Sequence, residues 1–262
     1  INYFNKTVVN QIIKKYEKAK IITATNVFAH IDNIDELIRN ILKLLKPRGI
    51  FISESHYFLS LVKTLQYDTI YHEHLRYYTV TSLKNIFKKY GLRIIKVKNI
   101  KTHGGSIRVY ATRDRGYPSH KSVNLALGKE KKYLSEKNLK LFRTKVLKNK
   151  IDLLDKIKNI KSNNNSIFAV GAPSRATTLV NYVGINEEMV DCICEIKGSH
   201  KIGHYLPGTR IPIMSEEVIF KKKPKYLLLL SWHISDELIK NLKKKGYKGK
   251  FIIPLPNPKI VS

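Results

Sequence analysis

The stretch Ile167-Phe168-Ala169-Val170-Gly171-Ala172-Pro173-Ser174-Arg175 carries the clearest fold signal in this chain. An apolar run predicts a buried strand, a glycine follows it, and helical spacing continues through Tyr182. A strand that turns directly into a helix leaves N–H groups and the positive end of the helix dipole at the turn, where phosphate binds readily. We therefore predict that Gly171, Ala172 and Pro173 contact a ligand, with Arg175 as a bidentate donor. Glycine is also common at such turns for purely structural reasons, so the motif alone is weak.

Strand-like and helical runs alternate on both sides of this stretch. The expected strands are 21–25, 50–53 with Glu54 at its end, 92–97, 107–112, 190–194, 226–231 and 251–254. The expected helices are 34–45, 57–65, one capped by Thr79 or Thr81 and reaching Lys89, 216–220 and 236–245. The run Lys46-Pro47-Arg48-Gly49 reads as a break after the first helix. Such alternation predicts an α/β fold with ligands at the carboxyl ends of parallel strands.

The lysine-rich region between the two alternating parts has helical spacing, and it predicts one or two connecting helices over 121–162. A basic coiled coil is the alternative, but no heptad is sustained. The polar run 162–166 marks a domain entrance. We therefore expect a first domain over 1–115, a helical connector over 116–162 and a second Rossmann-like α/β domain over 163–262.

The chain is strongly basic, with 49 Lys and Arg against 20 Asp and Glu and a net charge of +29. This charge would normally indicate nucleic acid. The lysines are spread over helical faces, however, and no helix-turn-helix or RNA-binding aromatic motif is present. Abundant lysine, isoleucine and asparagine are what an AT-biased genome produces. We therefore expect no nucleic acid and favour an anionic small substrate.

The remaining composition favours a cytoplasmic protein. No apolar run approaches the ~18 residues of a membrane span, and the mixed, polar start is not a signal peptide. Cys192 and Cys194 are too close for an ordinary disulfide, so we expect buried thiols on one face of a strand, in a reducing compartment.

The segment Tyr71-His72-Glu73-His74 concentrates groups suited to proton transfer. An imidazole titrates near neutral pH, a carboxylate can orient it, and a phenol can donate to a developing oxyanion. A metal site or a satisfied polar cluster is the alternative. Adjacent residues diverge on a strand, and the helical H-E-x-x-H spacing is absent, so we expect no metal here.

Two further loops are candidate ligand sites. His103-Gly104-Gly105-Ser106, followed by Arg108, is a glycine turn beside polar groups, although residue chemistry alone favours a simple hairpin. The loop 200–209 combines basic, aromatic and glycine residues, with Lys201 and Tyr205 as contacts. It fits a clamp over a nucleotide-linked sugar and a solvated loop equally well.

Five phrases now coincide in order. They are Asn26-Val27-Phe28-Ala29-His30, Asp68-Thr69-Ile70-Tyr71-His72-Glu73-His74, His103-Gly104-Gly105-Ser106, Gly171-Ala172-Pro173 and Tyr205-Leu206-Pro207-Gly208-Thr209. From about Ile21 to the carboxyl terminus the chain resembles the S-adenosylmethionine-dependent C-methyltransferases of dTDP-linked 4-keto-6-deoxy sugars. The expected pair of strands over 92–97 and 107–112 resembles the antiparallel finish of a methyltransferase sheet.

The resemblance implies roles for individual residues. His74 would be the general base that removes the proton from C-3 next to the 4-keto group, and Glu73 would orient or charge-stabilise it. Tyr71 would donate toward the enolate oxygen or shape the pocket. Asn26 and Val27 would be cofactor contacts at a strand end. The candidates for the sugar or diphosphate are His103, Ser106 and Arg108.

The sequence departs from this family at its start. The family has an amino-terminal zinc module, and its cysteines are absent here, as are the glycine-rich first loop and the acidic residue that holds the cofactor ribose. We therefore expect a fragment that begins near the fourth strand of the methyltransferase sheet, with zinc only in the missing module. The competing readings are a different methyl acceptor, a non-catalytic nucleotide-sugar-binding module and a basic nucleic-acid binder.

Overall fold

The computed structural model describes residues 2–262 and divides them into two compact units. The first unit comprises the residues up to Val62 together with His72–Asn138, and the second comprises Lys63–Tyr71 together with Leu139–Ser262. The chain therefore passes from one unit to the other after Val62, after Tyr71 and after Asn138. Each unit has its own sheet and its own apolar core.

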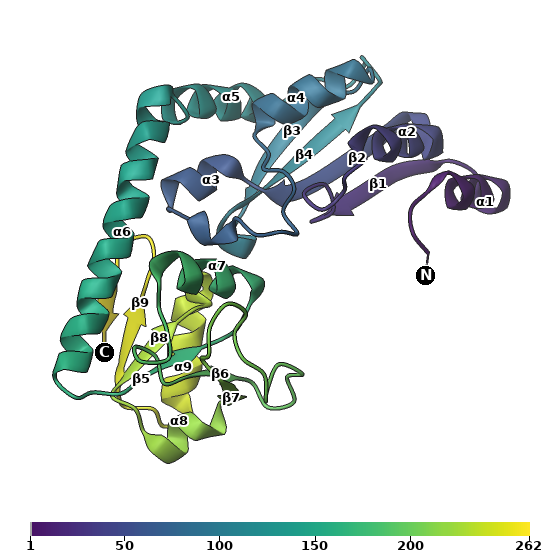
Figure 1. Cartoon of the computed structure of the whole chain (residues 1–262). Coiled ribbons are helices and arrows are strands. Elements are labelled where there is room, and N and C mark those ends of the chain that lie inside the picture. The colour runs from purple at the N-terminus through teal and green to yellow at the C-terminus, as the bar shows by residue number, and fades with distance from the viewer. Residues whose placement is uncertain (1) are drawn as a thin grey trace. The chain divides into compact units, whose positions relative to one another are not determined.

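The first unit is built on a four-stranded sheet in the order β1-β2-β4-β3 (Figure 1). The strands are β1 (Ala19–Thr25), β2 (Leu45–His56), β3 (Arg93–Ile100) and β4 (Ser106–Thr112). β1 and β2 are parallel, whereas β4 runs antiparallel to both β2 and β3. The expected antiparallel finish of the sheet is thereby confirmed.

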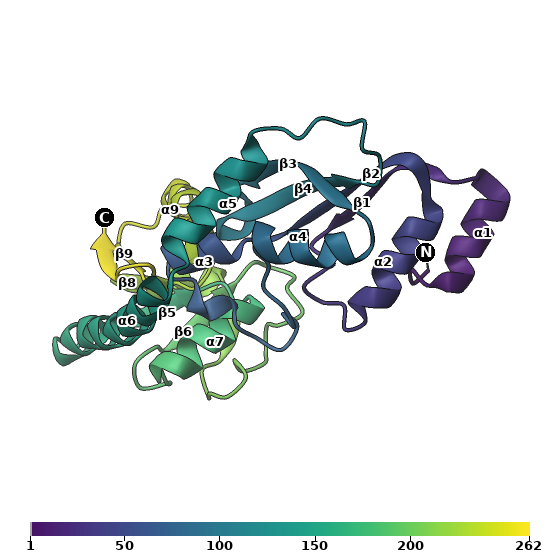
Figure 2. The same ribbon diagram turned by 90° about the horizontal axis from the view of Figure 1, so that it is seen from above.

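Helices α2 (Ile34–Leu44), α4 (Val80–Lys89) and α5 (Ser122–Tyr133) cover one face of this sheet, as Figure 2 shows for α2 and α4. Helix α1 (Lys6–Tyr16) packs against α2, and the short helix α3 (Phe58–Lys63) follows β2. Phe28, Phe51 and Phe87 are fully buried between sheet and helices, with ring centroids 5.7 to 6.2 Å apart. The opposite face of β2 and β4 carries polar side chains, including Glu54 and Arg108.

Two sequence expectations about β2 were wrong. Lys46–Gly49 does not end the secondary structure, because the strand starts at Leu45 immediately after α2. Leu45 pairs with Ala19 and Ile50 with Ile21, so the intervening residues bulge out of the ladder instead of breaking it. The strand also continues to His56, which places Glu54 inside it and not at its end.

A buried carboxylate from α5 organises the start of α4. Glu130 accepts the Tyr57 hydroxyl at 2.8 Å, the N–H groups of Val80 and Thr81 at 2.5 and 2.9 Å, and the Thr81 hydroxyl at 2.5 Å. Burial raises the pKa of the Tyr57 phenol, and its hydrogen bond to Glu130 raises it further. The expected cap is also present, since the Thr79 side chain forms a capping box at the same helix end.

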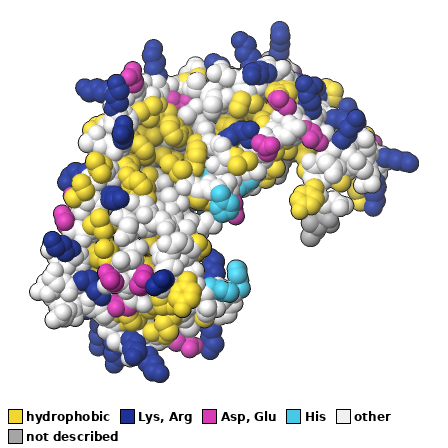
Figure 3. All heavy atoms as spheres, viewed as in Figure 1, with side chains coloured by type: hydrophobic (Ala, Val, Ile, Leu, Met, Phe, Trp, Pro, Cys, Tyr) yellow, Lys and Arg dark blue, Asp and Glu magenta, His cyan; other side chains and the backbone are white. Residues whose placement is uncertain are grey.

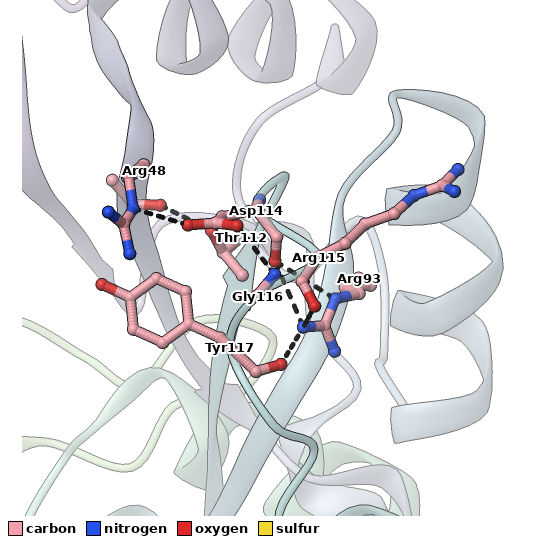
Figure 4. A network of polar contacts seen from close by, with 8 residues as sticks. Arg48, Arg93, Thr112, Asp114, Arg115, Gly116 and Tyr117 are labelled. Atoms are coloured by element: carbon pink, nitrogen blue, oxygen red, sulfur yellow. Dashed lines mark hydrogen bonds and ion pairs between the residues drawn. The ribbon is translucent and has the colours of Figure 1, made fainter.

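The turn after β4 is closed around Asp114 (Figure 4). Its carboxylate accepts the Gly116 N–H at 2.8 Å and Arg48 Nε at 2.9 Å. Arg93 donates to the carbonyls of Asp114, Arg115 and Tyr117. The hydrogen bond from Gly116 and then the one from Arg48 hold the pKa of Asp114 below its usual value.

The second unit is built on a six-stranded sheet in the order β10-β9-β8-β5-β6-β7 (Figure 1). The strands are β5 (Ile167–Val170), β6 (Cys192–Glu195), β7 (Ile213–Ser215), β8 (Tyr226–Leu229), β9 (Lys250–Ile253) and β10 (Lys259–Val261). All neighbouring strands are parallel except β10, which is antiparallel to β9. The predicted Rossmann-like parallel sheet is therefore confirmed.

Helices and one short segment from earlier in the chain complete the second unit. The helices are α6 (Glu136–Ser162), α7 (Ser174–Val183), α8 (Glu217–Lys222) and α9 (Ser235–Lys244). The earlier segment contains the short 3-10 helix η1 (Tyr67–Thr69), whose Tyr67 hydroxyl donates to Asn149 of α6 at 2.8 Å. The two cysteines are buried free thiols with Sγ atoms 3.8 Å apart, as expected.

Candidate active site

In the first unit, the segment 72–78 is bound along the loop that follows β1. The Leu75 N–H donates to the Ala29 carbonyl at 2.9 Å. The Arg76 guanidinium donates to the carbonyls of Ile31 and Asp32 at 2.5 and 2.9 Å. Because these bonds join two loops that are distant in sequence, side chains from both converge beside the carboxyl ends of β1 and β2.

His74 lies where these side chains meet. Its ring centroid is 5.1 Å from that of His30, 6.2 Å from that of His56 and 6.0 Å from that of Tyr77. We call His30, His56 and His74 the histidine cluster. His56 and His74 are half-buried and His30 is exposed, so the cluster is partly shielded while a ligand can still reach it. Imidazoles placed in this way can exchange protons near neutral pH.

Glu73, which was predicted to orient His74, lies beside the other neighbouring histidine. Its Oε1 atom is 4.0 Å from His72 Nε2, and the side chains of Glu73 and His72 are 54% and 85% exposed. An exposed pair of this kind holds neither side chain firmly. Tyr71 is the last residue of the segment that belongs to the second unit. The catalytic roles of His74, Glu73 and Tyr71 stay predictions.

The predicted cofactor residue Asn26 and the predicted substrate residue His103 contact each other. Asn26 Nδ2 lies 3.3 Å from His103 Nε2. Both residues have a left-handed backbone, with φ of 55° and 54°. Residues other than glycine rarely adopt this conformation. The Asn26 N–H donates to the Glu54 carbonyl at 2.8 Å, which fixes the end of β1 against β2. Backbone strain of this kind is concentrated at ligand sites. Val27 follows, half-buried against the core.

The predicted substrate residues Arg108 and Ser106 lie on the polar face of the sheet. Glu54 Oε2 accepts Arg108 Nε at 2.7 Å and lies 2.6 Å from Nη2. The Glu54 side chain is 6% exposed and that of Arg108 is 36% exposed, so the guanidinium reaches solvent from a buried partner. The hydrogen bond to Glu54 raises the pKa of Arg108. Ser106 is buried opposite His56 in the ladder, and its hydroxyl donates to the Thr102 carbonyl at 3.3 Å.

In the second unit, the turn Gly171–Pro173 lies at the switch point of the sheet. It follows β5, which pairs with β6 on one side and with β8 on the other. Strands β6 and β7 lie on one side of β5, and β8, β9 and β10 lie on its other side. Ligands bind outside the carboxyl ends of parallel strands at such a point. Gly171 has φ of 84°, and a Cβ atom there would lie 2.6 Å from Ser231 Oγ. Only glycine therefore allows this turn to approach the end of β8.

Two charged side chains hold the turn at Ala172. The Ala172 N–H donates to Glu195 Oε1 at 2.5 Å, and the Ala172 carbonyl accepts Lys201 Nζ at 2.7 Å. Lys201 was predicted as a ligand contact, whereas Glu195, the last residue of β6, was not. Tyr205 is 63% exposed in the following loop, as a clamp over a ligand requires, and its role stays a prediction.

Arg175 is enclosed in the second unit. Its Nε and Nη2 atoms donate to the two carboxylate oxygens of Asp68 at 2.7 and 2.8 Å. Trp232 Nε1 donates to the same carboxylate at 2.7 Å, and the Arg175 guanidinium lies 4.9 Å from the Trp232 ring. The side chains of Arg175 and Asp68 are 8% and 0% exposed. We interpret Arg175 as an anchor for η1, and a direct ligand contact by Arg175 stays a prediction.

Sequence reasoning missed His30, His56, Glu195 and Asp68. His30 lies within the motif Asn26–His30, which suggested no separate role for it. A single histidine at the end of a strand, such as His56, carries no local sequence pattern. Glu195 had a usable signal, because an acidic residue at the end of the second strand of a Rossmann-like unit is a known binding position. Within residues 2–262, no group of three or more His, Cys, Asp or Glu side chains is arranged to hold a metal ion. None of the helices in this part of the chain is long and apolar enough to span a membrane.

The fold and the site together define a methyltransferase-type sheet followed by a Rossmann-like unit, and comparison with known proteins agrees. Residues 101–256 match the family described as the C-methyltransferase C-terminal domain, and residues 2–97 match a methyltransferase domain. Because the first match covers more than half of the chain, the chain belongs to this C-methyltransferase family.

A curated relative is similar along nearly the whole chain. The C-methyltransferase NovU of Streptomyces niveus is 30% identical over 263 residues, which cover 99% of this chain and 62% of NovU. The chain therefore spans less than two thirds of the length of this relative.

Proposed function

We propose that the protein containing this chain is an S-adenosylmethionine-dependent C-methyltransferase that acts on C-3 of a dTDP-linked 4-keto-6-deoxy sugar. The observation that carries the proposal is the position of His74. It is half-buried in the histidine cluster beside the carboxyl ends of β1 and β2, in a chain of a C-methyltransferase family. Carbon methylation next to a ketone needs such a base, because the carbon must first lose a proton.

In this mechanism His74 removes the C-3 proton, which the neighbouring 4-keto group acidifies. Tyr71 donates toward the enolate oxygen, and Glu73 stabilises the imidazolium that forms on His74. The hydrogen bonds of Leu75 and Arg76 hold the loop that carries His74, so its imidazole is positioned before the substrate arrives.

Asn26 and Val27 would contact the cofactor. The exposed Asn26 amide offers a donor and an acceptor at the end of a parallel strand, and Val27 offers an apolar neighbour, which suits a ligand with both polar and apolar parts. S-adenosylmethionine, when bound, supplies an electrophilic methyl group to the deprotonated carbon. Metal is not needed for the steps assigned to these residues.

Each unit carries candidate residues for the nucleotide-sugar. In the second unit the candidates are Gly171–Pro173 at the switch point, with Lys201 and Tyr205 in the adjoining loop. In the first unit His103 and the guanidinium of Arg108 are the candidates for the sugar or diphosphate. The cationic side chains match the charge of a diphosphate. On the face in Figure 3, Lys and Arg side chains are spread over the surface among other residues.

The test is to incubate the native protein with S-adenosylmethionine and dTDP-4-keto-6-deoxyglucose and to analyse the product by NMR. A new C–CH₃ group with loss of the C-3 proton is expected. An O-methylated product that retains this proton would contradict the proposal in favour of a different acceptor. Saturable binding of the sugar nucleotide without any methyl transfer would support a non-catalytic binding module instead.

A further inference from the structure

His56 is placed to influence His74 without forming part of its loop. It is the last residue of β2 and is held in the ladder opposite Ser106. Its ring centroid lies 6.2 Å from that of His74, with 57° between the ring planes. The backbone at His56 is fixed by a strand, whereas His74 lies on a loop. His56 therefore extends its imidazole toward the candidate base from a backbone that the sheet holds in place.

The groups around His74 differ in whether they change charge near neutral pH. His30 and His56 contribute imidazole rings, the side-chain type that can change charge in this range, whereas Tyr77 contributes a phenol. Glu54 and Arg108, on the same face as His56, form an ion pair whose charges offset each other. Glu73 is paired with His72 and is more than half exposed. Two of the rings beside His74 are therefore imidazoles, whose charge can change near neutral pH.

Imidazoles a few ångströms apart compete for protons. When one carries a proton, its positive charge disfavours a second proton on its neighbour, and the titrations become coupled. We propose that His56 is a positioning residue that keeps His74 in its neutral, proton-accepting form by competing with it for the same proton. This inference rests on the proposed function, in which His74 is the base.

The sign of the effect follows from the charge at position 56. His56→Gln removes a titratable cation of similar size, so the pKa of His74 rises and the acid limb of kcat/KM moves up by about 0.5 to 1 pH unit. His56→Lys keeps a positive charge at all relevant pH values, so the limb moves down instead. A purely structural role would lower activity in both variants without moving the limb in opposite directions.

The experiment measures pH profiles of kcat/KM for the native protein, His56→Gln and His56→Lys. His120→Gln is the matched control, since His120 is an exposed histidine of the same unit that accepts only a local bond from the Ser122 N–H. The control should leave the limb in place. Opposite shifts in the two His56 variants would support the inference, and an acid limb unchanged in both would overturn it.

A second measurement does not depend on turnover or on the variants folding. Imidazole ¹⁵N shifts of the unsubstituted protein are followed against pH. Coupling predicts that His74 titrates in two steps, one of which coincides with His56. A single ordinary step for His74 would overturn the inference. If His74→Gln keeps near-normal turnover, His74 is not the general base and the proposed function fails. The NMR result still decides whether the two imidazoles share a proton.

Discussion

Asp68 and His74 are close in sequence, yet their side chains lie in opposite kinds of environment. In the second unit the Asp68 carboxylate is fully buried and is bonded by Arg175 and Trp232. In the first unit His74 is half-buried, with the rings of His30, His56 and Tyr77 beside it. One cluster is closed and charge-balanced, and the other is open and able to change its charge.

The comparison shows that residue type alone does not separate ligand contacts from anchors. Arg175 follows a glycine turn at the end of a parallel strand, where an arginine would be expected to meet a ligand. Its Nε and Nη2 donors are nevertheless used inside the unit, and it stacks on Trp232. His30 and His56, for which no role was predicted, have ring centroids 5.1 and 6.2 Å from that of the candidate base. Burial and partners decide the role in each case.

The largest expected effect is a loss of methyl transfer when the histidine cluster is changed, with little change in stability. We expect His74→Gln to reduce methyl transfer by about 10²- to 10⁴-fold, the usual contribution of a general base. Thermal unfolding should change little, because backbone and Arg76 bonds hold the loop. Product formation, cofactor binding by calorimetry and the melting temperature are the measurements. Turnover close to that of the native protein would remove His74 from the base role.

The closed cluster should behave in the opposite way. Asp68→Ala leaves the Arg175 guanidinium buried without its carboxylate, and we expect a loss of about 3–5 kcal/mol in the free energy of unfolding. Glu217→Ala is the control, because its pair with Lys197 is 66% and 82% exposed and should contribute less than about 1 kcal/mol. Urea unfolding measures both. Equal losses of unfolding free energy for Asp68→Ala and Glu217→Ala would contradict the contrast between the buried and the exposed ion pair.

A smaller effect is expected at the buried carboxylate of the first unit. Glu130→Gln replaces a charged acceptor at the start of α4 by a neutral one and places an amide NH₂ beside the N–H groups of Val80 and Thr81. We expect a loss of about 1–3 kcal/mol in unfolding free energy. Tyr57→Phe, which removes one donor to the same carboxylate, should cost less. The reverse order in urea unfolding would show that Glu130 does not organise this helix end.

The smallest effect is a pH dependence at the turn in Figure 4. The folded pKa of Asp114 is lowered, so its stabilising contribution is complete above its unfolded pKa of about 3.9 and is lost as the pH falls through the folded value. Asp114→Asn should therefore be slightly less stable than the native protein at pH 6. The difference should shrink under strongly acidic conditions. A difference that stays constant with pH would exclude the carboxylate charge as its cause.

Much of the fold follows from local sequence patterns. The apolar run before Gly171, the cap at Thr79 and the alternation of strands and helices each involve residues close together in the chain. The short strands β7 and β10 were missed, because three residues carry too little periodicity. The bulge at Lys46–Gly49 is defined only by pairing with β1, so a proline and a glycine there looked like a break.

The site was less predictable, because its contacts join distant residues. The motifs located His74, Asn26 and His103, but not the contact between the last two, which lie 77 residues apart. The Asp68 network was hidden for the same reason. Its partners follow 107 and 164 residues later, and no local pattern marks Asp68 as a buried anchor.

The passage of the chain between the two units has a consequence for synthesis on the ribosome. Asp68 is made 164 residues before Trp232, and at about 5–20 residues per second that interval is roughly 8–33 s. During this interval Trp232 has not yet been synthesised, so the Asp68 carboxylate cannot accept its N–H and remains hydrated. The residues that complete the sheet of the first unit have meanwhile emerged. The order of translation therefore allows the first unit to fold while Lys63–Tyr71 waits as an open loop for a partner not yet made.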